Sequence, residues 1–279
     1  MKNKENVSAT QPAPENGSRS QSGLDDALIW AAERGDGAEV ERLVLAGADG
    51  RRQESAALRA AALAGSVRCV AALLPVSDPQ ANSSSALRMA ALAKSAPCVR
   101  LLLPLSDARA EDSGALLYAA EGDSVECVEL LIPNSDPMAQ ECAAMMSAAR
   151  YGYADCLRAL LPVSDPRAMM SAALRLAASS GSLECVKILL AVCDPLARGA
   201  ACLEKAVAVG RPQVLAEILG CGASFSSVCD LDALAIKARA RGELEMVAMI
   251  RAFIERDELS RSDDEPLRVG KGPVAKGRL

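Results

Sequence analysis

The sequence predicts an all-α fold, a solenoid of stacked helix-turn-helix units with little or no β-hairpin. Aspartate recurs every 29 residues over five steps, at Asp49, Asp78, Asp107, Asp136, Asp165 and Asp194. Cysteine keeps the same 29-residue period, at Cys69, Cys98, Cys127, Cys156 and Cys185. A fixed period of about 20–50 residues is typical of stacked repeats. Hydrophobic residues make up 51% of the chain and aromatic residues only 2%, which favours closely packed helices over a sheet core.

The chain begins with a polar segment. Residues 1–23 are rich in Ser, Asn, Gln, Pro and Gly and contain little that a fold buries, so a disordered N-terminal tail is expected. An alternative reading is an uncleaved export signal, since the N-termini of bacterial type III effectors have a similar composition. The segment lacks the apolar core of an ordinary secretory signal peptide.

From residue 24, each unit carries a turn followed by two short helices, as residues 78–106 illustrate. Asp78 and Pro79 predict a tight turn in which the aspartate accepts a local hydrogen bond. A first helix is expected to have Ser84 or Ser85 as its N-cap and to run to about Leu92. We assign a structural role to the periodic aspartates, because one per unit at a turn position is typical of capping.

The second helix of this unit is expected over residues 96–103, where Pro104 ends it. Its inward face carries Cys98, Val99, Leu102 and Leu103. Helices this short are not stable alone in water. Each unit must therefore bury its apolar face on a neighbour, and the array is expected to behave as one cooperative stack.

The units resemble ankyrin repeats. The first reads AAERGDGAEVERLVLAGAD, and later copies read ALRAAALAGSVRCVAALLPVSD, LLYAAEGDSVECVELLIPNSD and ALRLAASSGSLECVKILLAVCD. The resemblance covers about residues 24–258, in about eight units with atypical end caps. It implies a protein-binding module whose first helices and turns line a concave face. An ankyrin unit has about 33 residues, and the shortening here falls where that family carries its β-hairpin finger. We therefore expect the helix pair to be retained and the finger trimmed.

The last unit ends in a charged helix expected over residues 243–256, with Val247, Ile250 and Ile254 as its apolar stripe. Residues 259–279 are expected to form a disordered C-terminal tail, whose end is basic at Arg268, Lys271, Lys276 and Arg278. A solvated tail is the simpler interpretation; contact with an acidic surface or nucleic acid is the alternative.

Composition excludes several classes of function. The net charge of −5 argues against a nucleic-acid-binding body, and no apolar run is long enough to predict a transmembrane helix. The chain has no histidine, no phosphate-binding loop and no nucleophile motif. We therefore expect no enzyme activity, no catalytic residue, no cofactor and no metal.

The periodic cysteines are expected to be reduced. Equivalent positions of stacked helices lie about 8–10 Å apart, whereas a disulfide needs Cα atoms within about 7 Å. Metal-binding CxxC pairs are also missing. The sequence therefore predicts buried thiols in a reducing, cytoplasmic compartment, with export into a host cell as the alternative.

The variable positions of the first helices are the candidate partner-binding residues. Arg59, Arg88 and Arg175 occupy one position in units two, three and six, where units four and five have Leu117 and Met146. Tyr118 follows Leu117, and the turn after unit five's first helix adds Arg150 and Tyr151. Tyrosine and arginine are enriched at binding hot spots. We expect a central apolar-aromatic patch flanked by arginines on the concave face. The alternative is that several methionines fill core gaps, and Met145 fits that alternative.

The sequence favours a monomeric scaffold or adaptor that docks another protein, of unknown identity, on the concave face. The alternatives are a bacterial effector that uses the same face inside a host cell and a self-associating structural array. We expect no membrane partner, and nucleic acid only as a partner of the C-terminal tail.

Overall fold

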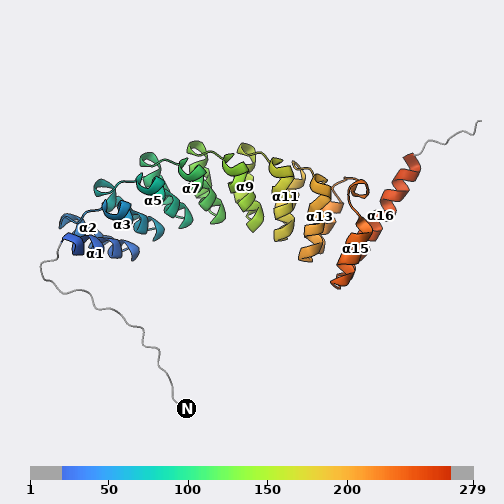
Figure 1. The fold of residues 1–279 in the computed structure, drawn as a ribbon, viewed down its shortest axis with the longest axis horizontal. Coiled ribbons are helices and arrows are strands. Elements are labelled where there is room, and N and C mark those ends of the chain that lie inside the picture. Colours follow the sequence, from blue (N-terminus) through green and yellow to red (C-terminus); the bar gives the residue numbers. More distant parts are fainter. Residues whose placement is uncertain (1–20, 265–279) are drawn as a thin grey trace, which may run out of the picture.

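The computed structural model describes residues 21–264, and within them it has sixteen α-helices, five short 3₁₀ helices and no β-strand. The helices pair into eight units that stack side by side into a curved array (Figure 1). The all-α solenoid expected from the sequence is confirmed.

Each unit has a first helix and a second helix. The first helices are α1 (Gln21–Glu33), α3 (Arg52–Leu63), α5 (Ala81–Leu92), α7 (Ala110–Glu121), α9 (Ala139–Tyr151), α11 (Ala168–Ser180), α13 (Ala197–Val209) and α15 (Leu231–Ala240). The second helices are α2 (Gly37–Leu45), α4 (Val67–Leu73), α6 (Ala96–Leu102), α8 (Val125–Leu131), α10 (Ala154–Leu160), α12 (Leu183–Leu190), α14 (Pro212–Leu219) and α16 (Leu244–Asp264).

The core runs through the whole array as one continuous cluster. In unit three, α5 buries Leu87, Ala90 and Ala91, and α6 buries Cys98 and its apolar neighbours. Burying one leucine contributes about 1.5–3 kcal/mol. Because these side chains meet their partners in adjacent units, a unit removed from the stack would lose most of that contribution.

The second helices end slightly earlier than expected. In unit three, α6 stops at Leu102, and Leu103–Leu105 form a 3₁₀ turn that contains Pro104. The same 3₁₀ turn follows α4, α8 and α10, each time with a proline. Proline has no N–H to continue the α-helical hydrogen bonds, so the chain tightens into the next turn.

The expected N-cap of the first helices is wrong. Ser84 follows Asn82 and Ser83 in a left-handed turn with φ of 50–55°, and only from Ser85 does α5 become right-handed. Six units, two to seven, contain this three-residue left-handed turn. A left-handed residue other than glycine costs about 1–2 kcal/mol. The turn occupies the place of the trimmed finger, so contacts with the next unit must offset its cost.

One such contact is a hydrogen bond between neighbouring units. The third residue of each left-handed turn is buried, and in units two to six its side chain accepts a hydrogen bond from the backbone N–H of the next periodic aspartate. The distances are 2.8 Å for Ser55 and Asp78, 2.8 Å for Ser84 and Asp107, 2.7 Å for Ser113 and Asp136, and 3.1 Å for Ser171 and Asp194. In unit one, the buried Asp25 carboxylate replaces the serine and accepts from Asp49 at 2.8 Å.

The periodic aspartates have the structural role predicted for them. Asp78 Oδ1 accepts a hydrogen bond from Gln80 N at 2.9 Å, and the same local turn recurs at all six positions. In three turns the serine before the aspartate adds a second bond between units: Ser77 Oγ donates to Gly50 O at 3.1 Å, and Ser106 Oγ and Ser135 Oγ donate to Pro79 O and Ala108 O at 3.4 Å. Each turn is therefore fixed both within its unit and to its neighbour.

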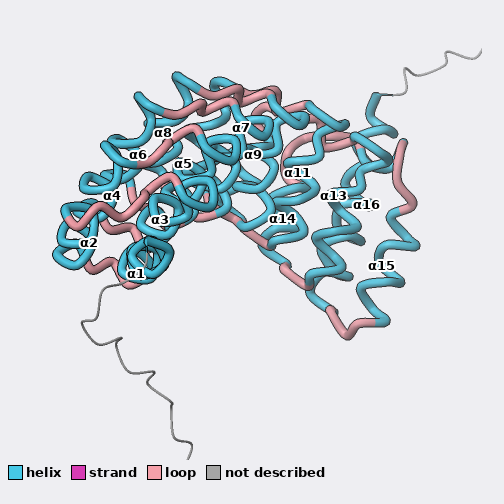
Figure 2. The backbone as a smooth tube through the Cα atoms, turned by 60° about the vertical axis from the view of Figure 1, so that its left-hand side comes forward, coloured by secondary structure: helices cyan, strands magenta, loops and turns pink. Residues whose placement is uncertain are grey.

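The array curves toward its first helices. The first helices of adjacent units contact one another more extensively than the second helices do. Figure 2 shows α2, α4 and α6 along the outer side of the arch, with α1, α3 and α5 inside them. The concave partner-binding face expected from the sequence stays a prediction.

The helical region extends past both expected boundaries. It begins at Gln21 rather than residue 24, because Gln21 Nε2 donates to Asp25 Oδ1 at 2.9 Å and to Gly47 O at 3.0 Å. Helix α16 continues to Asp264 rather than ending at residue 258, and Ser226 Oγ bonds Asp257 on it at 2.5 Å. The rest of both expected tails, residues 1–20 and 265–279, lies outside the described residues.

Candidate protein-binding surface

The candidate surface is the first-helix face, the half-buried and exposed positions of α3, α5, α7, α9 and α11 that point away from the second helices. The pattern of each helix creates it: Leu87, Ala90 and Ala91 are buried, so Arg88 and Met89 stand at the edge of the core. Of the predicted site residues, six are half-buried on this face: Arg59, Arg88, Leu117, Tyr118, Met146 and Arg175. Arg150 and Tyr151 are exposed.

The arginines do more than line the face. Arg88 Nη2 donates to Asn82 O at 3.1 Å, and Arg175 Nη1 donates to Met170 O at 2.6 Å and Met169 O at 3.2 Å. Both side chains therefore fold back on the left-handed turn of their own helix. Burial, followed by the charge of Arg198, lowers the pKa of Arg175. The sequence did not predict that these arginines hold the turns by hydrogen bonds, because no residue pattern in it predicts a left-handed turn.

The tyrosines lie in two settings. Tyr118 packs against the core. Tyr151, the last residue of α9, is 51% exposed and stacks on Tyr153, with ring centroids 5.8 Å apart. Stacking restricts the Tyr151 side chain, and an ordered exposed aromatic ring loses little conformational entropy on binding.

Three exposed methionines lie at the turns of units five and six. Met138, Met169 and Met170 are 51%, 53% and 68% exposed. The sequence places them near the candidate patch, but they were not among the predicted site residues. Met145, by contrast, is fully buried, as its position in the repeat indicates.

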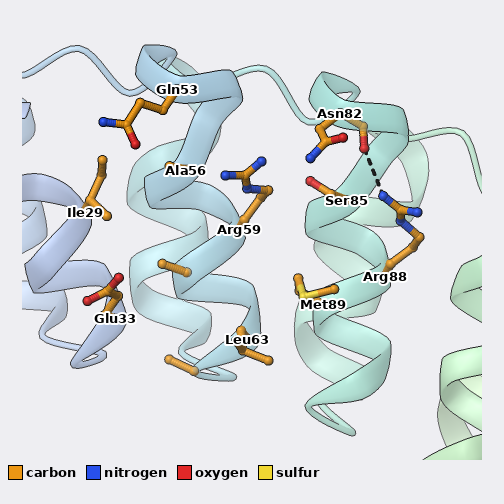
Figure 3. A pocket seen from close by; sticks show the side chains of 12 residues that line it. Ile29, Glu33, Gln53, Ala56, Arg59, Leu63, Asn82, Ser85, Arg88 and Met89 are labelled. Atoms are coloured by element: carbon orange, nitrogen blue, oxygen red, sulfur yellow. Dashed lines mark hydrogen bonds between the residues drawn. The ribbon is translucent and has the colours of Figure 1, made fainter.

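A groove at the N-terminal end of the same face was not predicted. It lies between α1, α3 and α5, has a volume of about 770 Å³, and contains Arg59 and Arg88 (Figure 3). Ile29 and Glu33 come from α1, and the amides of Gln53 and Asn82 come from the left-handed turns. Only the two arginines were identified from the sequence, because the rest of the groove depends on how three units stack.

The five periodic thiols are free and fully buried. Burial raises the pKa of Cys98, Cys127 and Cys185, and burial together with Asp123 raises that of Cys156 to about 12. They are small core residues, as predicted. Over residues 21–264, no three or more Asp, Glu or Cys side chains gather in a way that would hold a metal ion. In that same part of the chain, no helix is both long and apolar enough to span a bilayer.

Comparison with known proteins identifies the repeat. Three overlapping stretches, residues 28–112, 87–170 and 116–199, match the sequence pattern of ankyrin repeats. The crystal structure of the human ASB11 ankyrin repeat domain is similar, with a TM-score of 0.54 and 22% sequence identity over 64% of this chain and 96% of that one. At this identity the similarity shows the fold alone. No curated protein sequence matches the chain.

Proposed function

Because the chain belongs to the ankyrin repeat family, whose domains generally bind proteins, we propose that it is a scaffold or adaptor that docks a partner protein on its first-helix face. The proposed contact centres on units four and five, at Leu117, Tyr118, Met146 and Tyr151. Arg59, Arg88, Arg150 and Arg175 flank it. The family is typically non-catalytic, and no catalytic role enters the proposal.

The observation that carries this proposal is Tyr151. Its ring is half-exposed and held by Tyr153, yet it is not needed by the buried core. Elsewhere the buried side of the first helices is mostly alanine and leucine. Aromatic side chains of this kind are enriched at interface hot spots.

Affinity capture with the full chain tests the proposal. The double variant Tyr118→Ala/Tyr151→Ala is expected to lose the captured protein while keeping its helicity by circular dichroism. Trp30→Ala is the matched control, because Trp30 is an aromatic residue of similar exposure outside the proposed contact. Equal capture by the double variant and the unaltered chain would contradict the proposed site.

The same face would serve the two alternatives. An exported effector would use it inside a host cell, and measurement of export directed by residues 1–20 tests that role. A self-associating array would appear as an oligomer in light scattering. We expect a monomer in the cytoplasm. The last unit exposes Lys237, Arg239 and Arg241 beside Ile236 and Leu244, so its end is not uniformly apolar.

A further inference from the structure

The groove between α1, α3 and α5 has more cationic hydrogen-bond capacity than its neighbours use. Arg59 lies 3.8 Å from Glu54, and Arg88 lies 3.9 Å from Glu111, both too long for hydrogen bonds. The Arg88 side chain is 16% exposed, and its Nε atom is buried with no hydrogen-bond partner among the described residues. A buried, unpaired N–H is costly, so the Arg88 side chain would gain by turning its guanidinium toward a ligand that accepts from it.

The groove presents its polar groups with a repeat. Gln53 and Arg59 in unit two correspond to Asn82 and Arg88 in unit three, each pair 29 residues on. Figure 3 shows the two amides near the turns and the two guanidinium groups below them on their helices. Packed helices are about 8–10 Å apart, so an arginine and an amide recur at about that interval along the groove.

That interval fits one peptide conformation. A polyproline II helix has three residues per turn and rises about 3.1 Å per residue, so side chains three apart point the same way about 9 Å apart. In a β-strand, residues three apart point to opposite faces. A polyproline II segment also makes no internal hydrogen bonds, so its backbone is available to the amides of Gln53 and Asn82.

We propose that this groove binds an acidic polyproline II segment of a partner, with carboxylates at positions i and i+3 held by Arg59 and Arg88. Arginine pairs with carboxylates through two parallel hydrogen bonds, which suits guanidinium groups with free donors. This inference rests on the proposed function and names the kind of segment that one part of the first-helix face recognises.

Unit six provides an internal comparison. Arg175 occupies the same position there, but the corresponding residue before it is Met146 and the one after it is Glu204. Its guanidinium is also engaged by the Met170 carbonyl at 2.6 Å. Arg198 lies near enough to lower the pKa of Arg175, but it stands at the turn position equivalent to Asn82. Arg175 therefore lacks a second arginine at the 29-residue interval, and it serves as a matched control.

Selection from a displayed library of random 12-residue peptides on the full chain tests the inference. We expect enrichment of peptides that combine proline with two acidic residues three apart. With the unaltered chain, the best peptide should bind roughly 30-fold more tightly, or better, than its Gln analogue or a version with the acids two apart. Affinity should fall as NaCl is raised.

Arg59→Gln/Arg88→Gln should lower the peptide affinity by a similar factor. Arg175→Gln also removes an arginine that hydrogen-bonds a left-handed turn, but it should leave the peptide affinity unchanged. Tyr118→Ala/Tyr151→Ala should leave peptide binding intact, which separates this test from that of the proposed function. The inference is wrong if no acidic pair is enriched, if spacing is irrelevant, or if Arg59→Gln/Arg88→Gln binds the peptide as well as the unaltered chain.

Discussion

Two joints, the turn contacts that link one unit to the next, use equivalent positions but differ in hydrogen bonding. One links units three and four, and the other links units five and six. In the first, Ser84 accepts from Asp107 at 2.8 Å, and Ser106 Oγ donates to Pro79 O at 3.4 Å. In the second, Cys142 Sγ lies 3.3 Å from Asp165 N, and Ser164 Oγ is buried with no hydrogen-bond partner within residues 21–264.

This difference shows how one residue can change the coupling between units while the fold stays the same. Sulfur is a weak acceptor, so the joint after unit five gains less than the joint after unit three. Both joints also carry an exposed ion pair, Arg100–Glu126 in one and Arg158–Glu184 in the other, which does not distinguish them. The weaker joint lies between units five and six, at the opposite end of α9 from Tyr151 of the proposed contact.

The largest expected effect is a loss of folding stability at alkaline pH, caused by the buried thiols of both regions. A thiol whose pKa is raised by folding stays protonated in the native state, while the unfolded chain ionises near pH 8.5. Stability is therefore complete below about pH 8.5 and falls as the pH approaches the folded pKa, by about 1.4 kcal/mol per pH unit for one thiol. Urea unfolding from pH 8 to 11 measures this.

Cys156 of unit five has a pKa of about 12, raised by burial and by Asp123. The pKa of its counterpart in unit three, Cys98, is raised by burial, and no carboxylate contributes to that shift. We expect Cys156→Ala to flatten the pH dependence more than Cys98→Ala. Equal slopes for the two variants would show that Asp123 does not contribute.

Ser84→Ala should break the stronger joint. It leaves the Asp107 N–H without its acceptor, at a cost of about 1–2 kcal/mol. The urea midpoint should fall, and hydrogen exchange at the Asp107 amide should accelerate most. Cys142→Ala, at the equivalent position, should cost less. Similar losses in the two variants would contradict the ranking of the joints.

Cys142→Ser should sharpen the comparison by giving the weaker joint the stronger acceptor. We expect a gain of about 0.5–1 kcal/mol, with slower hydrogen exchange at the Asp165 amide. Cys127→Ser is the control, because it places a hydroxyl at a fully buried helical position and should destabilise the protein. A destabilised Cys142→Ser protein would mean that the sulfur is held by packing rather than by its hydrogen bond.

The sequence predicts the fold well because the repeat period and the helix pattern are local and redundant. Leu87, Ala90 and Cys98 are buried as their spacing indicates, and Asp78 forms the expected turn. Ser84 shows where such reasoning fails. Its position before a helix favours an N-cap, but its hydroxyl bonds the chain 23 residues further on, in the next unit.

The candidate surface was predictable only in part. Helical periodicity places Arg88 and Tyr118 on one face, but it does not reveal that Arg88 bends back to the Asn82 carbonyl. Nor does it reveal the groove, since Ile29, Gln53 and Asn82 come together only when three units stack with a particular curvature. Contacts between units are the information that a single repeat lacks.

The recurring bond from a turn side chain to the next aspartate has a consequence for how such a chain can evolve. Units two, three, four and six offer the next unit the same serine acceptor and meet the same aspartate N–H, so a whole 29-residue unit of this kind can be gained or lost without creating a new kind of joint. Recombination between copies in the gene would then change the length of the array by whole units. The number of units is therefore freer to vary among descendants than the sequence of any one turn.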